Sequence, residues 1–304
     1  NTTYRVDVSD AAPMNVMGSP YVKNRYLLRI HRTGYQSAES IASELAWLSA
    51  LRHQAGLAVP EPVLSLEGAP LVTVSAPGIP EPRVCSLLRW INGRFCDRCK
   101  PGHFGAVGDL MARLHDHAVH WKPPTGFTRR WWDWEGLFGD NAGFHLDSDE
   151  VWALLPDDYH DMFHAVARQV GQVMLEMGQG PDASGLIHAD LHMGNLLFSG
   201  GEARPIDFDD CGLGYWVYDF AVALSDWQDS PEWPRYHDAL LKGYAQVRPL
   251  PEEQLNYLDL FMAARRVALM LWATDMAQVN SNYRAGLEGW LARYAGRVRQ
   301  YLDS

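Results

Sequence analysis

Cysteine is scarce in this chain, which has 4 in 304 residues. Small disulfide-stapled domains carry a far denser set, so a disulfide framework is excluded, and we expect reduced thiols and a cytoplasmic location. Long hydrophobic runs are also missing. The best candidate, residues 258–277, contains four charged side chains: Asp259, Arg265, Arg266 and Asp275. A transmembrane helix needs about 18 or more apolar residues in a row, so we predict no membrane partner.

Basic residues are fewer than acidic ones. The chain has 26 Lys and Arg and 37 Asp and Glu, which gives a formal net charge of -11. An acidic surface disfavours nucleic acids and anionic membranes as partners and suits a cationic or neutral one. Several short catalytic motifs are absent as well. The chain has no Walker A loop, no H-E-x-x-H, no G-x-S-x-G and no G-x-G-x-x-G, which disfavours P-loop ATPases, zinc proteases, serine hydrolases and dinucleotide enzymes.

What the chain does contain is enough apolar sequence for a large core, with 47% hydrophobic residues and 12 Trp. Its length predicts one large domain or two lobes. Residues 1–91 are strand-rich, with strands predicted at 3–8, 21–30, 71–75 and 83–91 and one helix at 37–55. Helices are predicted afterwards at 104–117, 157–177, 236–244, 255–279 and 284–302. We therefore expect an α+β protein whose domains are residues 1–91 and 92–304.

Four polar side chains stand out between residues 186 and 210. His188, Asp190 and Asn195 follow an apolar pair, and Asp207 comes after a short glycine-containing turn. The apolar residues on either side predict two short buried strands that present these groups at their ends. Phosphoryl transfer needs one carboxylate to orient the attacking hydroxyl and take its proton, and Asp190 suits that role. It also needs oxygen ligands for Mg²⁺, and Asn195 with Asp207 would supply them.

Metal-held phosphates also call for a cation from the strand-rich part of the chain. Arg29, in the predicted strand 21–30, is the candidate. A carboxylate on a helix usually orients such a cation, and Glu44 in the predicted helix 37–55 is placed to do so.

Five segments together resemble those of the aminoglycoside phosphotransferase and choline kinase superfamily, the small-molecule relatives of protein kinases. They are the H-x-D-x-H-x-G-N run at 188–195, the I-D-F at 206–208, the Y-D at 218–219, the L-H at 114–115 and the linker at 88–94. The resemblance covers nearly the whole chain. It implies a bilobal, protein-kinase-like fold, with a small antiparallel sheet and one helix over a larger helical lobe that binds the acceptor. It also implies ATP in the cleft, without excluding GTP, with adenine at the backbone of Leu88, Trp90 and Ile91.

Two departures from the family pattern concern the nucleotide side. The family cation is most often Lys, whereas this chain has Arg29, and Lys23 is a nearby alternative. Arginine always carries its charge and binds phosphate in a fork, so nucleotide binding would survive with a changed geometry. Residues 1–6 resemble the segment that covers the nucleotide phosphates. We therefore expect that the family's preceding strand is absent from this numbering.

The resemblance implies a kinase that phosphorylates a hydroxyl of a small molecule, such as an aminoglycoside or other antibiotic, an amino alcohol, a sugar or an amino acid. The alternatives are a bacterial Ser/Thr protein kinase of the stress-response type and a catalytically dead nucleotide-binding protein. Residues 211–219 run directly from Asp207 to the supporting Asp219, which leaves no room for a peptide-docking activation segment. That short link favours a small acceptor, which the acidic chain suggests is cationic.

Four features stay open between two interpretations. Cys96 and Cys99 form a C-x-x-C, which we interpret as an ordinary loop, because zinc would need two further ligands, such as the helical histidines around His115. The tryptophans at 131, 132 and 134 either pack in the core or stack on a substrate. Asp209 is either a second metal contact or a polar turn residue, and His192 either faces a phosphate or packs in its loop.

Overall fold

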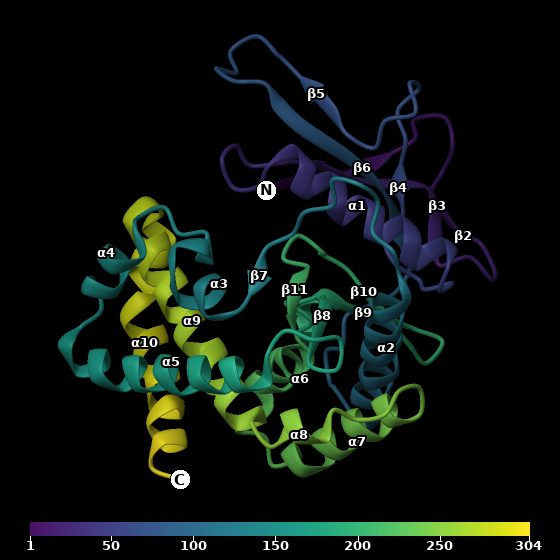
Figure 1. Ribbon diagram of the computed structural model, residues 1–304. Coiled ribbons are helices and arrows are strands. Elements are labelled where there is room, and N and C mark those ends of the chain that lie inside the picture. The colour runs from purple at the N-terminus through teal and green to yellow at the C-terminus, as the bar shows by residue number, and fades with distance from the viewer. The chain divides into compact units, whose positions relative to one another are not determined.

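The computed structural model describes all residues, 1–304, and is an α+β structure (Figure 1). Two compact units are formed, each from segments that are distant in the sequence. One contains Asn1–Arg129, Asp190–Cys211 and Arg235–Arg248, and the other contains Arg130–Ala189, Gly212–Pro234 and Pro249–Ser304. These units divide the chain at other places than residue 91, so the division into 1–91 and 92–304 stays a prediction.

The first unit is built on a six-stranded antiparallel sheet. Its strands are ordered β1 (Thr2–Asp7), β3 (Tyr21–Ile30), β6 (Arg83–Ile91) and β4 (Pro62–Val63), while β2 (Met14–Asn15) pairs with β3 and β5 (Val72–Val74) with β6. Register places Arg29 opposite Ser86 and Leu27 opposite Leu88. Directly opposed residues share a face of the sheet. The two strands therefore present Arg29 and Leu88 on the same side.

Helix α1 (Ala38–His53) follows β3 in the sequence and confirms the helix predicted at 37–55. It begins where the Ser37 hydroxyl accepts the N–H of Ser40 at 3.1 Å, which satisfies one of the free donors of the first turn. Ile41, Leu45 and Leu48 recur at helical spacing and are buried. Glu44 lies on the same packed helix and is 0% exposed, so this carboxylate must find its partners inside the protein.

The remainder of the first unit carries the polar loop found in the sequence. After α2 (Pro101–His120), the unit continues with the short 3₁₀ turn η2 (Met193–Asn195) and the hairpin of β9 (Leu196–Ser199) and β10 (Glu202–Pro205). Helix α7 (Trp233–Ala245) packs on α2. Arg94, the last residue of the linker, exchanges two backbone hydrogen bonds with Phe198, of 3.1 and 2.8 Å. The linker is therefore attached to the strand that follows Asn195.

The second unit is mainly helical around a three-stranded sheet. The sheet contains β7 (Trp131–Trp132), β11 (Gly212–Tyr215) and β8 (Ser184–Ile187). The helices are α3 (Trp134–Phe138), η1 (Asp140–Ala142), α4 (Ser148–Ala153), α5 (Asp157–Met177), α6 (Trp216–Leu224), η3 (Ser225–Trp227), α8 (Glu252–Leu255), α9 (Leu258–Val279) and α10 (Ser281–Leu302). The predicted helix 255–279 is α9, which begins at Leu258 after the short α8 and ends at the predicted residue. No helix has both the length and the apolar composition of a membrane span.

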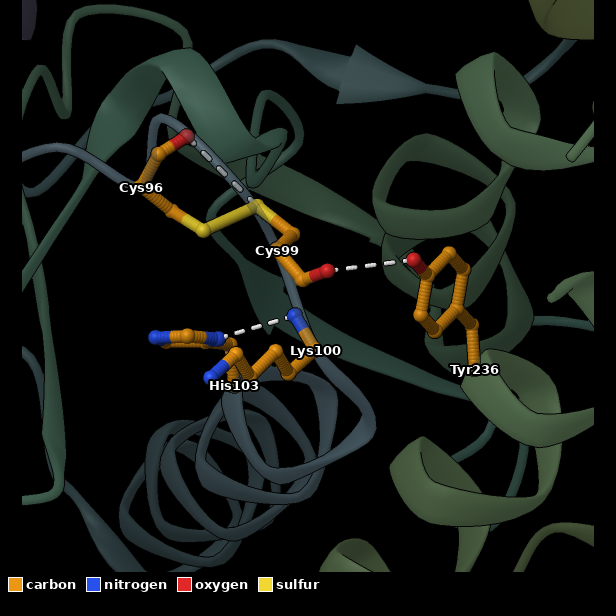
Figure 2. Close-up of a disulfide and its surroundings, with 5 residues drawn as sticks. All are labelled: Cys96, Cys99, Lys100, His103 and Tyr236. Atoms are coloured by element: carbon orange, nitrogen blue, oxygen red, sulfur yellow. Dashed lines mark hydrogen bonds between the residues drawn. A yellow bond between two sulfur atoms is a disulfide. The ribbon is translucent and has the colours of Figure 1, made fainter.

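Cys96 and Cys99 are joined by a disulfide, which corrects the expectation of an ordinary loop with reduced thiols. Figure 2 shows the bonded pair beside Tyr236, whose hydroxyl donates to the carbonyl of Cys99 at 3.1 Å. Both sulfur atoms are used in the bond, so neither is a thiolate ligand for zinc. A disulfide in a four-residue turn requires no other cysteine, which is why the low cysteine content did not exclude it.

Candidate active site

Asp190 and Asn195 are brought together by the turn that follows β8. The Asn195 side-chain amide donates to the carboxylate of Asp190 at 2.8 Å and to its backbone carbonyl at 3.0 Å. The nitrogen of that amide is thereby used, and the carboxamide oxygen remains as an acceptor. The Asp190 side chain is 22% exposed, so it is held in place and still accessible to a ligand.

His192 packs within this loop. Its Nδ1 accepts the N–H of Gly194 at 3.0 Å, so the ring proton lies on Nε2, which is 3.5 Å from the Asp190 carboxylate. A Cβ on Gly194 would lie 2.6 Å from Cε1 of His192. Only glycine allows this close approach, which gives the H-x-G spacing a physical reason.

Asp219 supports the backbone immediately before Asp190. In the second unit this α6 carboxylate, 0% exposed, accepts the N–H of His188 at 3.1 Å and the N–H of Ala189 at 2.7 Å. Ala189 has φ of 65°, a left-handed conformation that costs free energy in a residue with a Cβ. Two hydrogen bonds to one buried carboxylate hold that conformation in place, as the resemblance implied for the Y-D pair.

A second contact group contains Arg29, Glu44 and Asp207. The Arg29 guanidinium donates to Glu44 at 2.8 Å and to Asp207 at 3.2 Å, and its side chain is only 4% exposed. Burial alone lowers the Arg29 pKa, but the carboxylates of Glu44, Asp207 and Asp209 outweigh burial and raise it. Arg29 is therefore a permanent charge that a nearby helix orients. Lys23, on the same strand, has no contact with either carboxylate among those observed.

The two groups are neighbours, because the Ile206 N–H donates to the Asn195 carbonyl at 2.9 Å. That bond places Asp207, the next residue, beside the turn that carries Asn195. Asp207 itself has φ of 61°, which is again left-handed. The structure therefore brings Asp190, Asn195 and Asp207 into one region of the first unit.

Carboxylates exceed cations around Arg29. Glu44 Oε2 and Asp209 Oδ1 are buried and have no hydrogen-bond partner. Burial, and then the charge of Glu44, raise the pKa of Asp209 to about 6, although Arg29 opposes the change. An all-oxygen donor set with unbalanced negative charge fits a hard divalent cation such as Mg²⁺, which usually takes one or two protein ligands and fills its shell with phosphate and water. Asp209 thus belongs to this cluster: it lies in a turn, its side chain is 17% exposed and its Oδ1 atom is buried.

The predicted adenine-contacting residues do not form a single group. Trp90 and Ile91 line a cavity of about 400 Å³ together with Asn92, Gly93 and Arg94. Leu88 is buried within the sheet and does not line it. Ile91 also packs with Tyr21 and Leu197, and Ile206 lies against that small apolar cluster. A flat purine could meet apolar side chains at this edge of the sheet.

One buried residue of the site had no sequence motif. Arg129, 7% exposed, donates to the carbonyls of Asp209 and Cys211, close to Asp207. It lies 80 residues from Asp209 in sequence, inside a Trp-rich segment that predicted no regular structure. Only the folded chain reveals this contact.

Comparisons with known proteins show the family and the fold of this chain. A profile of the phosphotransferase enzyme family matches residues 2–253. A homoserine kinase of Chelativorans sp. (strain BNC1) is 29% identical over 85% of this chain and 74% of its own length. A solved microcompartment-associated aminopropanol kinase has a TM-score of 0.80 and 29% identity, covering 98% of this chain and 94% of its own. An amicoumacin kinase structure with AMP-PNP and Ca²⁺ has a TM-score of 0.75 at 22% identity, covering 98% and 85%. The α+β, protein-kinase-like fold predicted from the sequence is confirmed.

Proposed function

We propose that this chain, which belongs to the phosphotransferase enzyme family, transfers the γ-phosphoryl group of ATP to a hydroxyl of a small molecule that also carries an amino group. The family and its kinase relatives make the chain a phosphotransferase with a hydroxyl acceptor. Two observations support an amine-bearing acceptor. The chain has a formal net charge of -11, and the similar proteins include kinases named for homoserine and aminopropanol.

In the proposed mechanism Asp190 orients the acceptor hydroxyl and accepts its proton. The hydrogen bond from Asn195 fixes the Asp190 carboxylate, whose side chain is 22% exposed. Asn195 and Asp207 would hold Mg²⁺, which supplies positive charge to the phosphates when bound. Arg29, oriented by Glu44, would add a second, fixed positive charge. Trp90 and Ile91, with Leu88 behind them, would contact adenine, and a backbone-read purine leaves GTP as an alternative donor.

The observation that carries the proposal is the proximity of three groups from two loops. Asp190 is bonded to Asn195, and Asn195 is bonded through its backbone to the residue before Asp207. Transfer of a phosphoryl group depends on positioning and charge more than on covalent chemistry by the protein. Asp190 as base, with Asn195 and Asp207 as metal ligands, would be held by these hydrogen bonds in the position that the transfer requires.

The test is transfer of label from γ-labelled ATP with Mg²⁺ to a panel of amino alcohols, hydroxy amino acids, aminoglycosides, neutral sugars and a generic protein substrate. We expect label on an amine-bearing acceptor, and a fall in rate of about 10²–10⁴-fold in Asp190→Asn, the usual contribution of a general base. Asp109→Asn is the matched control, because Asp109 pairs with Arg113 on the surface of α2.

Three results would contradict the proposal. Full activity in Asp190→Asn would exclude Asp190 as the general base. Label on protein alone would indicate the Ser/Thr kinase, and ATP binding without transfer to any acceptor would indicate a catalytically dead protein.

A further inference from the structure

Arg129 is a buried arginine whose guanidinium contacts two different parts of the first unit. On the side of the segment that follows Asp207, Nε donates to the carbonyl of Cys211 at 2.5 Å and Nη2 donates to the carbonyl of Asp209. Toward the start of α1, Nη1 donates to Gln36 Oε1 at 2.7 Å and to both the carbonyl and the hydroxyl of Ser40 at 3.1 Å. One rigid fork therefore joins the segment that follows Asp207 to the helix that carries Glu44.

The neighbours of Arg129 reinforce this connection. Gln36 donates its own amide to the carbonyl of Asp209 at 2.6 Å, and the Ser40 hydroxyl donates to Gln36 at 2.9 Å. Tyr35 donates to the Asp210 carboxylate at 3.2 Å. None of the observed partners of Arg129 is a carboxylate. Its charged guanidinium instead fixes neutral carbonyl, amide and hydroxyl oxygens.

The geometry leads from Arg129 to the site in two short steps. Glu44 lies one helical turn after Ser40, and Glu44 orients Arg29. Asp209 and Cys211 lie two and four residues after Asp207, whose left-handed backbone needs support from its surroundings. Loss of the hydrogen bonds from Arg129 to the segment 209–211, or to the start of α1, would change the distance between Arg29 and Asp207. That distance is 3.2 Å between the bonded atoms.

We propose that Arg129 is a positioning residue that sets Asp207 against Arg29 and thereby tunes metal-dependent nucleotide binding. This inference rests on the proposed function, because it assumes that Asp207 binds the metal of a nucleotide complex. In this role Arg129 acts through the backbone carbonyls of Asp209 and Cys211 and not as a ligand of the nucleotide or the acceptor.

The experiment measures AMP-PNP binding by calorimetry over a series of MgCl₂ concentrations, with the melting temperature of each variant recorded beside it. In Arg129→Met we expect the apparent Mg²⁺ affinity to fall at least tenfold. Arg129→Lys keeps the charge but loses the planar fork, and we expect it to remain at least threefold weaker than the natural chain.

Arg266→Met is the matched control. Arg266 is 3% exposed and also donates to a carbonyl and a glutamine oxygen, of Ser225 and Gln228, all three in the second unit. The Arg266→Met variant should have a lower melting temperature, and its apparent Mg²⁺ affinity should stay within twofold of that of the natural chain. Gln36 and Arg129 both donate to the Asp209 carbonyl, and a double-mutant cycle with Gln36→Ala and Arg129→Lys tests that shared contact. We expect the effects of the two substitutions on the apparent Mg²⁺ affinity to be non-additive.

The two proposals fail in different ways. If the natural chain shows no Mg²⁺-dependent AMP-PNP binding, the proposed function and this inference fall together. If it binds and Arg129→Lys matches it in Mg²⁺ dependence, or if the Gln36 cycle is additive, the positioning role alone is overturned. Should Arg129→Met fail to fold, Arg129→Lys and Gln36→Ala carry the test.

Discussion

Individual residues at this site are held in conformations and environments that cost free energy. Ala189 and Asp207 have left-handed backbones, which cost about 1–3 kcal/mol each in residues with a Cβ. Glu44 is 0% exposed with one oxygen unpartnered. Hydrogen bonds from Arg29 and to Asp219 offset these costs. The strain is concentrated where the proposed chemistry needs fixed groups.

His31 predicts an acid-sensitive stability. It is 4% exposed beside Arg29, bonds to Ser86 at 3.0 Å, and has its pKa lowered to about 4 by burial and then by the Arg29 charge. The unfolded chain takes up the proton near pH 6.5 and the folded chain only near pH 4. The contribution of His31 to stability is therefore complete above pH 6.5 and falls by about 3 kcal/mol between pH 6.5 and 4, while the raised pKa of Asp209 contributes with the opposite sign below pH 6.

Urea unfolding at several pH values measures that loss. His31→Gln keeps a hydrogen-bonding side chain without a titrating ring, and it should flatten the profile across this window. The exposed His120 serves as control, because His120→Gln should leave the profile as it was. An unchanged profile in His31→Gln would show that other groups cause the acid sensitivity.

Arg29→Met should destabilise the chain by about 3–5 kcal/mol at neutral pH, because it leaves the buried Glu44 carboxylate without its partner. Arg29→Lys keeps a cation and should lose far less. The double variant with Glu44→Leu should recover most of the loss. Chemical denaturation provides these values, and a loss below about 1 kcal/mol in Arg29→Met would mean that the pair is not held as the structure shows.

At the scale of elements, glycines allow α2 and α7 to approach closely. A Cβ on Gly108 would lie 2.0 Å from the carbonyl oxygen of Leu240, and a Cβ on Gly243 would lie 2.0 Å from that of Gly105. Neither contact is possible for a residue with a side chain. Each helix therefore lies against the backbone of the other.

Gly243→Ala should therefore destabilise the chain by about 1–3 kcal/mol, although alanine is the better helix former. Gly289→Ala is the control, because a Cβ there meets nothing within 4 Å in the middle of α10. That control should raise stability by about 0.5–1 kcal/mol. Thermal unfolding compares the two, and equal shifts of the same sign would contradict the close helix contact.

For the whole molecule, the important feature is that one compact unit holds every residue of the proposed site. Arg29, Glu44, the linker, Asp190, Asn195 and Asp207 all belong to that unit, although its segments span residues 1 to 248. The supporting Asp219 belongs to the other unit. Nucleotide binding is thus expected to stabilise one unit in particular.

Hydrogen exchange with Mg²⁺ and AMP-PNP tests that expectation. We predict added protection in β3, β6 and residues 195–209, and none in α10. At a ligand concentration of 100 times Kd, mass action adds about 2.7 kcal/mol to the free energy of unfolding. Protection confined to α9 and α10 would place the nucleotide in the wrong unit and contradict the assignment of Arg29 and Asp207.

The sequence by itself determined the features that depend on neighbouring residues. Strands Tyr21–Ile30 and Arg83–Ile91 and helix Asp157–Met177 have the predicted bounds, because side-chain periodicity and caps act within one element. The order of Asp190, Asn195 and Asp207 was also visible, because the loop and its hairpin are local. The roles of these residues remain predictions, as does the lobe boundary at residue 91.

Only the tertiary structure decided the contacts between distant segments. Arg29 and Asp207 are 178 residues apart, and nothing local specifies their 3.2 Å contact. The buried oxygen of Asp209 and the fork of Arg129 likewise depend on where the chain returns on itself, whereas the bond between Cys96 and Cys99 joins residues only three apart. Loop closure and desolvation are properties of the folded chain, so a one-dimensional pattern carries no signal for them.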